Sequence, residues 1–294
     1  MELALNQESR GRLTKDGIRI YDHEDFAGMH AAGRLAAEIL DAMCDMVVPG
    51  RTTGELDSAI TKMVEEAGAT SATIGYKGYQ HASCISVNHV VCHGIPGAPI
   101  PLSKSETISR DLEKRRKSDA LVEGDIVNID VTVIVDGWFG DTSRMYKAGK
   151  LPGKSERLIQ VTHDALMLGI EAVKPGNTFG DIGHAIQSYV ESQRMSVVRD
   201  FCGHGLGRVF HAPPNVLHYG RPGTGAVLEP GMLFTIEPMV NLGRPETQTL
   251  ADDWTAVTRD KTLSAQFEHS VGVTDDGVEI FTLSPAGKFH PTSE

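Results

Sequence analysis

Cysteine is scarce in this sequence, and none of it stands at motif spacing. The 294 residues include four cysteines, with no CxxC pair among them. A disulfide scaffold and a thiolate zinc module both need denser, regularly spaced cysteines, so neither fits this chain. We expect reduced thiols in a reducing compartment; they are Cys44, Cys84, Cys92 and Cys202.

Positive charge and long apolar runs are also lacking. The formal net charge is −11, which argues against a nucleic-acid groove as the main function, so no DNA partner is expected. The N-terminal stretch MELALNQESRGRLTKDG has no apolar run long enough for a signal peptide, and no other stretch could span a bilayer. We therefore expect a soluble cytoplasmic protein without a membrane partner.

What the sequence does contain is a β-hairpin signal in residues 126–144, IVNIDVTVIVDGWFGDTSR. Apolar β-branched residues lead to Asp136-Gly137, a dipeptide that favours a two-residue turn because it tolerates positive φ. The facing pairs in this register are Val135–Trp138, Thr132–Asp141 and Asp130–Ser143. Asp130 and Asp141 then share one face as diagonal neighbours, about 7–8 Å apart and within joint reach of one small ion.

Two carboxylates this close repel each other unless a cation or a shared proton lies between them. The simpler alternative is a pair of acids on a solvent-exposed strand. The flanking Ile, Val and Trp residues indicate a buried hairpin, and so favour the cation or the shared proton.

Two helices are predicted before this hairpin, after an extended arm at residues 1–21. The first begins near Asp22, whose side chain can cap it, and is expected to end at Pro49-Gly50. The second opens at Thr52, where Glu55 is placed for a capping box. The apolar stripe of the first helix is Phe26, Met29, Leu35, Ala36, Ile39, Leu40 and Met43.

Signals from the first half return in the second. PGRTTGELDSAI from Pro49 resembles PGNTFGDIGHAI from Pro175, an offset of 126 residues. EGDIVNID, ending at Asp130, resembles PGMLFTIE, ending at Glu237, at an offset of 107. The difference of 19 residues places an insert in the first half, and the polar segment 102–120 is the candidate. These repeats indicate that the chain arose by duplication of one half. The alternative is a chance similarity of two helix caps, and the matching acids, Asp130 and Glu237, argue against chance.

We therefore predict an α/β (α+β) chain of two related halves, roughly 22–150 and 151–284. The second half should end in its own strand pair, which carries one acid per strand as the first hairpin does. The strands and their acids are Met232–Val240 with Glu237, and Leu263–Thr274 with Glu268.

Inward-facing acids from both halves would place four carboxylates in one core. Buried charges cost several kcal/mol each unless they are paired, and divalent metals would pair them. His204, between two glycines, is the best candidate for a fifth donor, and His93 and His211 stand in similar loops. Carboxylates with imidazole favour Mn²⁺, Fe²⁺, Co²⁺ or Zn²⁺ and hence metal-assisted hydrolysis. The other nine of the 12 histidines, His218 among them, receive no role.

A series of motifs in order resembles the type I methionine aminopeptidases of the bacterial kind: CHGIPG, NIDVT with GDTSRMY, GHGLGRVFHAPP, FTIEP and SAQFEHS. The resemblance runs from about Ile18 to Thr282, nearly the whole chain. It implies the pita-bread fold, with two pseudo-symmetric α/β halves around a central antiparallel sheet, as one catalytic domain at residues 22–294. It also implies a monomer that removes the initiator methionine from nascent polypeptide N-termini and favours a small second residue.

The resemblance assigns each of the five donors to a metal position. Asp130 would chelate the first of two divalent ions, and His204 and Glu237 the second. Asp141 and Glu268 would bridge both ions. The positions that match a Na⁺ or K⁺ site of some members are Asn88, Val90 and Ser264. The alternative at those three positions is a loop and a strand that satisfy backbone groups.

Catalytic and substrate-binding roles follow from the same resemblance. Glu237 would shuttle the proton of the attacking water. His93 would contact the scissile amide nitrogen, and His211 would stabilise the oxyanion that develops in the transition state. An apolar, aromatic pocket would take the first side chain, and such a slot suits a flexible thioether. The residues that match it are Tyr76, Tyr79, Cys84, Phe210 and Trp254, together with His93 and His211.

The chain departs from the compact bacterial pattern in three ways. Thr73 stands where many relatives have cysteine at the edge of the pocket. The 102–120 insert carries a basic cluster, Arg110 with Lys114–Lys117, which is either a solvated loop or a contact with ribosomal RNA near the nascent-chain exit. The sequence has neither the Cys/His-rich zinc module nor the basic tail of eukaryotic relatives.

Two other functions share parts of this pattern. An X-Pro peptidase has the same five ligands, but those relatives carry a large domain before the catalytic one, whereas about 20 residues precede the first helix here. A binding protein of the same fold would have lost metal ligands, and this chain keeps all five positions.

Overall fold

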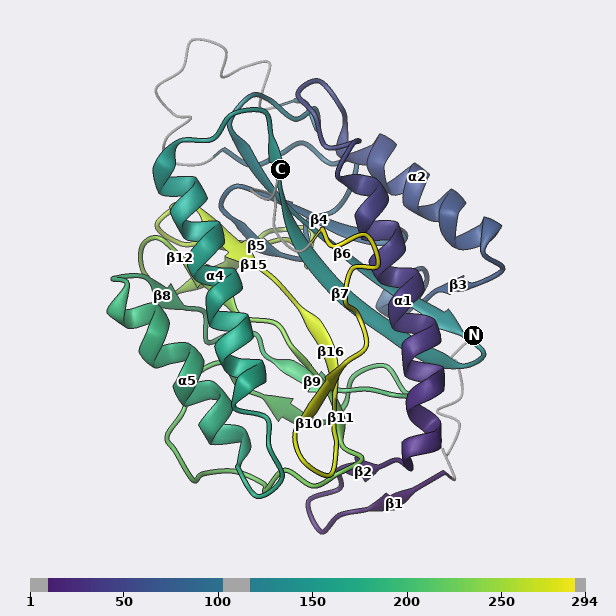
Figure 1. Ribbon diagram of the computed structural model, residues 1–294. Coiled ribbons are helices and arrows are strands. Elements are labelled where there is room, and N and C mark those ends of the chain that lie inside the picture. Colours follow the sequence, from purple (N-terminus) through teal and green to yellow (C-terminus); the bar gives the residue numbers. More distant parts are fainter. Residues whose placement is uncertain (1–9, 103–116, 289–294) are drawn as a thin grey trace.

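The computed structural model describes residues 10–102 and 117–288, so most of the predicted insert, with Arg110, lies outside the described residues. Helices lie over one side of a set of antiparallel sheets (Figure 1), which confirms the α/β (α+β) prediction. The helices are η1 (His23–Asp25), α1 (Phe26–Met43), α2 (Thr53–Glu66), η2 (Tyr76–Gly78), α4 (Gly153–Glu171) and α5 (Phe179–Ser192).

The strands are short except for one long pair in the first half. Those of the first half are β1 (Arg12–Leu13), β2 (Arg19–Ile20), β3 (Thr70–Ser71), β4 (Ser83–Val87), β5 (Val90–Cys92), β6 (Asp125–Val135) and β7 (Trp138–Ala148). Those of the second half are β8 (Ser196–Val197), β9 (Gly203–Gly205), β10 (Ala212–Val216), β11 (Leu233–Ile236), β12 (Met239–Asn241), β13 (Thr247–Thr249), β14 (Ala256–Thr258), β15 (Ser264–Gln266), β16 (His269–Val273) and β17 (Val278–Ile280).

The β6–β7 hairpin has the predicted register. The facing pairs are Val135–Trp138, Thr132–Asp141 and Asp130–Ser143. β3 and β4 pair with β6 as well, so this long strand is central to a four-stranded sheet. Asp130 and Asp141 are therefore fixed on one face of two long, paired strands.

Each half places two helices against its sheets, α1 and α2 in the first half and α4 and α5 in the second (Figure 1). α1 packs along β6 and β7, and α4 packs on β11, β12 and β15. A separate hydrophobic cluster lies under each helix pair. Because burial of apolar surface is the main favourable term in folding, these two clusters hold the strands of each half in place.

α2 and α5 begin with the predicted matching caps. Both helices run for 14 residues and both open with a capping box. In α2, the Thr52 amide donates to Glu55 and the Glu55 amide donates to Thr52 Oγ1. In α5, Thr178 and Asp181 occupy the same positions, and the Thr178 amide donates to Asp181 Oδ2 at 2.7 Å. These reciprocal bonds satisfy amides that a helix N-terminus leaves without partners.

The second strand pair is present, but it is interrupted. β11 pairs with β16 and β12 with β15, and the predicted strands at 232–240 and 263–274 are each divided in two. Pro238 has no amide hydrogen for a ladder. The Glu268 amide donates across the molecule to Ser143 O of β7 at 3.1 Å. The interruption is therefore the place where the two halves join.

Residues 10–21 differ from the predicted extended arm. β1 and β2 form a short antiparallel hairpin, and Ile18 and Ile20 are buried. The Tyr21 amide donates to Gly231 O at 2.9 Å, which ties the hairpin to the second half. Two-residue strands are too short to produce a periodic pattern, so the sequence did not predict this hairpin.

The first helix starts at the predicted place and ends early. The Asp22 amide donates to Asp25 Oδ2 at 3.2 Å at the start of η1, and α1 follows directly. α1 ends at Met43, before the predicted end at Pro49, because the chain turns at residues 44–46. Among the described residues, no helix combines the length and apolar character needed to cross a bilayer.

Candidate metal centre and substrate pocket

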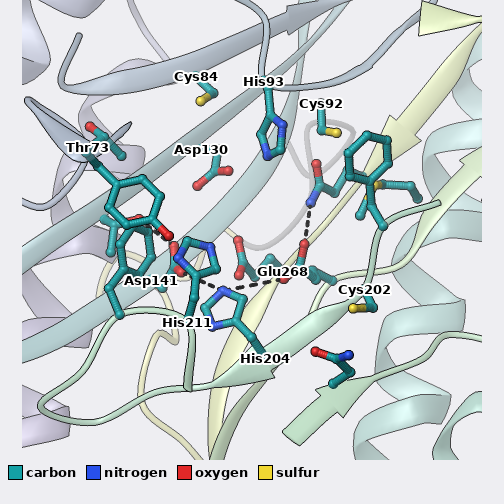
Figure 2. A pocket seen from close by; sticks show the side chains of 18 of the residues that line it. Thr73, Cys84, Cys92, His93, Asp130, Asp141, Cys202, His204, His211 and Glu268 are labelled. Atoms are coloured by element: carbon teal, nitrogen blue, oxygen red, sulfur yellow. Dashed lines mark hydrogen bonds and ion pairs between the residues drawn. The ribbon is translucent and has the colours of Figure 1, made fainter. Parts of the chain in front are cut away.

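One cavity of about 730 Å³ lies between the two halves, and all five predicted metal ligands line it (Figure 2). Asp130 comes from β6, Asp141 from β7 and His204 from β9. Glu237 follows β11, and Glu268 precedes β16. The structure therefore brings together four carboxylates and one imidazole that are up to 138 positions apart in the chain.

The polar atoms of these side chains are close enough to share ions. Asp141, His204 and Glu268 each offer one atom, and these atoms all lie within 4.8 Å of one another. His204 Nε2 is 3.4 Å from Asp141 Oδ2 and 3.8 Å from Glu237 Oε1. In Figure 2 the Asp130 carboxylate points toward the same space.

Hydroxyl and amide donors hold the carboxylates in place. Thr132 Oγ1 donates to Asp141 Oδ1 at 2.7 Å, and Thr235 Oγ1 donates to Glu237 Oε1 at 3.0 Å. Gln266 Nε2 donates to the other oxygen of Glu237 at 3.3 Å. Contacts of this kind fix the orientation of metal ligands and are as much a part of such a site as the ligands are.

Burial changes the acid strength of the carboxylates. It raises the pKa of Asp130 well above its ordinary value, and the charges of Asp141 and Glu237 raise it further. Burial also raises the pKa of Glu268, with the charge of Asp141 as the next cause. The pKa of Glu237 rises to about 7, again chiefly through burial. The group cannot be fully charged at neutral pH unless cations lie among these carboxylates.

The donor set therefore fits divalent metal ions. Burial alone would lower the pKa of His204, but its hydrogen bond to Asp141 and the charge of Glu237 outweigh burial and raise that pKa. A cation among the carboxylates would replace this proton as the partner of their charge. Four carboxylates and one imidazole are ligands that Mn²⁺, Fe²⁺, Co²⁺ and Zn²⁺ accept.

His93 and His211 line the cavity as neutral imidazoles. Burial lowers the pKa of His93, and burial followed by the charge of His204 lowers the pKa of His211 to about 4. The centroid of the His211 ring lies 4.2 Å from that of His204, and the ring stacks on Tyr76 at 5.2 Å. Both residues have positive φ, at 57° and 58°. Such a backbone is uncommon outside glycine and concentrates at functional sites.

An aromatic slot forms one side of the cavity. Its ring pairs are Tyr76 with Phe210, at 5.0 Å between centroids, and Tyr79 with Trp254, at 4.9 Å. Thr73 lies at the edge of the slot, and its hydroxyl donates to the backbone oxygen of His81 at 2.7 Å. The predicted pocket residues that line the cavity are Tyr76, Tyr79, Cys84, Phe210 and Trp254. Every predicted pocket residue therefore faces the same space as the carboxylates.

The three positions predicted for a monovalent cation are not among the residues that line this cavity. The Asn88 side chain donates to Asp125 Oδ1 at 2.8 Å and accepts from the Ile126 amide at 3.2 Å. The backbone oxygen of Asn88 accepts from the Ser264 amide at 2.9 Å, and Val90 pairs with β14. These contacts satisfy the polar groups by themselves, so the cation site stays a prediction.

His218 is a site residue to which the sequence assigned no role. Its ring is fully buried, and Nε2 accepts the Glu237 backbone N–H at 3.0 Å. Burial lowers the pKa of His218 to about 3, so the ring is neutral and can act as this acceptor. The bond fixes the Glu237 backbone at the break between β11 and β12. No motif marks His218, because its role depends on a contact between residues 19 positions apart.

Comparisons with known proteins agree with this geometry. The model of metallopeptidase family M24 matches residues 27–275. The chain is 52% identical to a methionine aminopeptidase of Rickettsia prowazekii, over 93% of this chain and 98% of that protein. It is 49% identical to the methionine aminopeptidase of Escherichia coli K12, over 90% of this chain and 94% of that protein.

Solved structures give the same result. The crystal structure of the Rickettsia prowazekii enzyme superposes with a TM-score of 0.83 at 53% identity, over 90% of this chain and 100% of that one. A prolidase from Pyrococcus horikoshii has a TM-score of 0.65 at 18% identity, which shows a shared fold and no more. The chain therefore belongs to metallopeptidase family M24 and, within it, to the methionine aminopeptidases, which have the pita-bread fold.

Proposed function

We propose that this enzyme removes the initiator methionine from nascent polypeptides with a small second residue, using two divalent cations held by its five donors. The observation that carries the proposal is the aromatic slot beside four carboxylates in one cavity (Figure 2). A first side chain in the slot would leave the first peptide bond over the donors. Methionine suits the slot because its flexible thioether packs well against aromatic rings.

When bound, the two cations would polarise the scissile carbonyl and make a water molecule nucleophilic near neutral pH. The protein would contribute the fixed positions of the donors. Asp141 and Glu237 are oriented by threonine hydroxyls, and the Glu237 backbone is held by His218. Preorganisation of this kind lowers the barrier because little reorganisation is needed during the reaction.

Three residues would handle protons and charge. Glu237 would take a proton from the attacking water and pass it to the departing amine nitrogen. His93 would contact that nitrogen. His211, as a neutral imidazole, would donate its N–H to the oxyanion that develops on the carbonyl oxygen, where a donor has its largest effect.

The preference for a small second residue would come from the side of the cavity opposite the slot. Figure 2 shows Cys202 across the carboxylates from Thr73. Phe201 and Met239 line the same cavity, and Met239 is buried. A bulky second side chain would have to displace packed groups there, at a cost that a glycine or alanine avoids.

The proposal places the enzyme in the cytoplasm as a monomer, with Mn²⁺, Fe²⁺, Co²⁺ or Zn²⁺ as its ions and a Na⁺ or K⁺ near Asn88 as a further candidate. Ribosome contact through the basic cluster of the insert is a separate proposal. Lys117, the part of that cluster among the described residues, is exposed. Deletion of residues 103–119, which removes the whole basic cluster, with unchanged co-sedimentation with ribosomes would rule that contact out.

The activity is tested by incubating the protein with Met-Gly-Gly and with a Gly-Pro peptide in the presence of Mn²⁺ or Co²⁺. We expect release of methionine and no release of glycine. Asp130→Asn should abolish the release, because the cations lose one of their carboxylate ligands and the other buried carboxylates are left without full compensation of their charge. Glu38→Gln, on the exposed face of α1, is the control and should not affect the release. Absence of methionine release from the metal-loaded protein would defeat the proposal, and glycine release would favour an X-Pro peptidase.

A further inference from the structure

The catalytic cavity adjoins a second hollow on the surface of the second half. This hollow has a volume of about 440 Å³, and Leu217 and Tyr219 are part of its lining. Asp16, Pro214 and Asn215 line both the catalytic cavity and the hollow. The two spaces are therefore separated by no more than the width of these side chains.

Strand β10 leads from one space to the other. It begins directly after His211, which lines the cavity, and it ends directly before Leu217 in the hollow. It is the outermost strand of its five-stranded sheet, and Pro213 and Asn215 are exposed along it. No other strand of the described residues covers the outer edge of β10, so an extended peptide can lie along its exposed side chains.

The lining of the hollow combines apolar side chains with the polar Asn215 and Thr224 and one charge. Leu217 is 39% exposed and belongs to the few large apolar side chains of the described residues that face solvent. Asp16, at the tip of the β1–β2 hairpin, is exposed and is the one charged side chain among the described residues that line the hollow. The exposed Leu217 gives the hollow an apolar wall against which a side chain of a bound polypeptide can pack.

We propose that β10 and this hollow bind the substrate polypeptide beyond its second residue; together they are called the β10 groove. The inference rests on the proposed function, because only a substrate with a continuing chain needs a path out of the cavity. An extended chain rises about 3.3 Å per residue. β10 has five residues, but its pairing with β9 shifts register between Ala212 and Asn215, so β10 spans at most roughly 16 Å, or up to about five substrate residues.

The chemistry of the β10 groove suits chains of varied sequence. Pro213 and Pro214 have no amide hydrogen, so few backbone hydrogen bonds can form on that stretch of the strand. Recognition then depends on packing against Leu217 and Tyr219 and on the charge of Asp16. The groove would favour an unfolded chain with an apolar or basic residue at about the fifth position over one with an acidic residue there.

The first test compares substrate lengths. On the metal-loaded enzyme, kcat/KM is measured for Met-Gly-Gly and for an eight-residue peptide that begins with the same three residues. The wild type should favour the long peptide several-fold. In Leu217→Glu the ratio of the two values should fall to near one. Leu283 is exposed to a similar extent, at 46%, and lines none of these spaces, so in Leu283→Glu the ratio should stay at the wild-type value.

The proposal would be overturned if the wild type had the same kcat/KM for the long and the short peptide. It would also be overturned if the ratio of these two kcat/KM values were the same in Leu217→Glu and Leu283→Glu. Failure of the wild type to release methionine from Met-Gly-Gly would instead defeat the proposed function, so the two failures are distinguishable.

A second test uses charge and does not depend on the folding of Leu217→Glu. Two eight-residue peptides that differ only in Lys or Glu at the fifth position are compared at low ionic strength. The wild type should prefer the Lys peptide, and Asp16→Lys, at the exposed hairpin tip, should reverse that preference. If both proteins prefer the same peptide to the same extent, Asp16 does not contact the bound substrate, and the assignment of the β10 groove is wrong.

Discussion

At the scale of single residues, buried side chains outside the donor set determine the shape of the cavity. Asp57 of α2 accepts the Ser83 amide at 3.0 Å and the Ser83 hydroxyl at 2.7 Å, and it lies 3.1 Å from His81 Nδ1. The backbone oxygens of His81 and Ser83 accept the hydroxyls of Thr73 and Tyr79. The Asp57 carboxylate therefore holds residues 73–83 in place, and this segment carries Tyr76 and Tyr79 of the aromatic slot.

Asp57→Ala should weaken substrate binding more than the chemical step. It leaves buried donors of Ser83 without an acceptor, at a cost of about 1–3 kcal/mol in the free energy of unfolding. We expect KM for Met-Gly-Gly to rise and kcat to change little, because the loss affects ground-state and transition-state binding alike. Metal content should match that of the wild type. Asp57→Asn keeps one acceptor oxygen, so its KM should lie between those of Asp57→Ala and the wild type. If Asp57→Ala folds and its KM equals that of the wild type, Asp57 does not have this role.

The sequence predicted the donors but not the residues that hold them. Asp130, Asp141 and Glu237 stand in motifs with recognisable strand and turn patterns, so local reasoning located them. Asp57 and His218 act through contacts 26 and 19 positions away, on elements whose relative placement no local pattern encodes. Their roles appear only when helix, loop and sheet are packed together.

At the scale of elements, local chemistry was sufficient where one turn or one cap determines the structure. The Asp136-Gly137 turn fixed the β6–β7 register, and the capping boxes fixed the starts of α2 and α5. In the second strand pair, Pro238 is a local signal for the break between β11 and β12, because proline cannot donate to a ladder. The break between β15 and β16 was not predictable in this way. It depends on the bond from the Glu268 amide to Ser143 O, which joins residues of different halves.

The capping box of α2 gives a prediction for that element. Thr52→Ala removes the acceptor of the Glu55 amide and should lower the free energy of unfolding by about 1 kcal/mol. Ser58→Ala is the control, because Ser58 is an exposed hydroxyl in the same helix that takes no part in the cap; its effect should stay within about 0.5 kcal/mol. Urea unfolding of both variants measures the difference, and equal midpoints would contradict the role of the cap.

At the scale of the whole molecule, the two halves have separate hydrophobic clusters and meet at a group of acids. The clusters stabilise each half, whereas the acids oppose the contact between the halves when they are charged and unpaired. Backbone hydrogen bonds, such as the one from the Glu268 amide to Ser143 O, hold the two halves together. Cations among the carboxylates would replace the repulsion between these acids with attraction to the shared ions. Metal binding and the association of the halves should therefore be coupled.

This coupling predicts a pH dependence that metal removes. The pKa values of Asp130 and Glu268 are raised in the folded chain, so between the ordinary carboxylate pKa of about 4 and the raised values the folded state binds more protons than the unfolded state. Their contribution to stability therefore falls as pH rises through this range. Burial lowers the pKa of His269 to about 3, which acts in the opposite direction, so the wild type must be compared with a variant.

Asp130→Asn is that variant, since it removes one raised carboxylate and keeps the side-chain volume. In chelator, the melting temperature of Asp130→Asn minus that of the wild type should increase from pH 5.5 to pH 7.5, because the wild type loses stability as its acids ionise. Saturating Mn²⁺ should raise the melting temperature of the wild type more at pH 7.5 than at pH 5.5, since protons compete with the ion at the lower pH. If this difference in melting temperature does not change with pH in chelator, the acids of the two halves do not repel each other. The coupling of metal binding to the association of the halves would then have no physical basis.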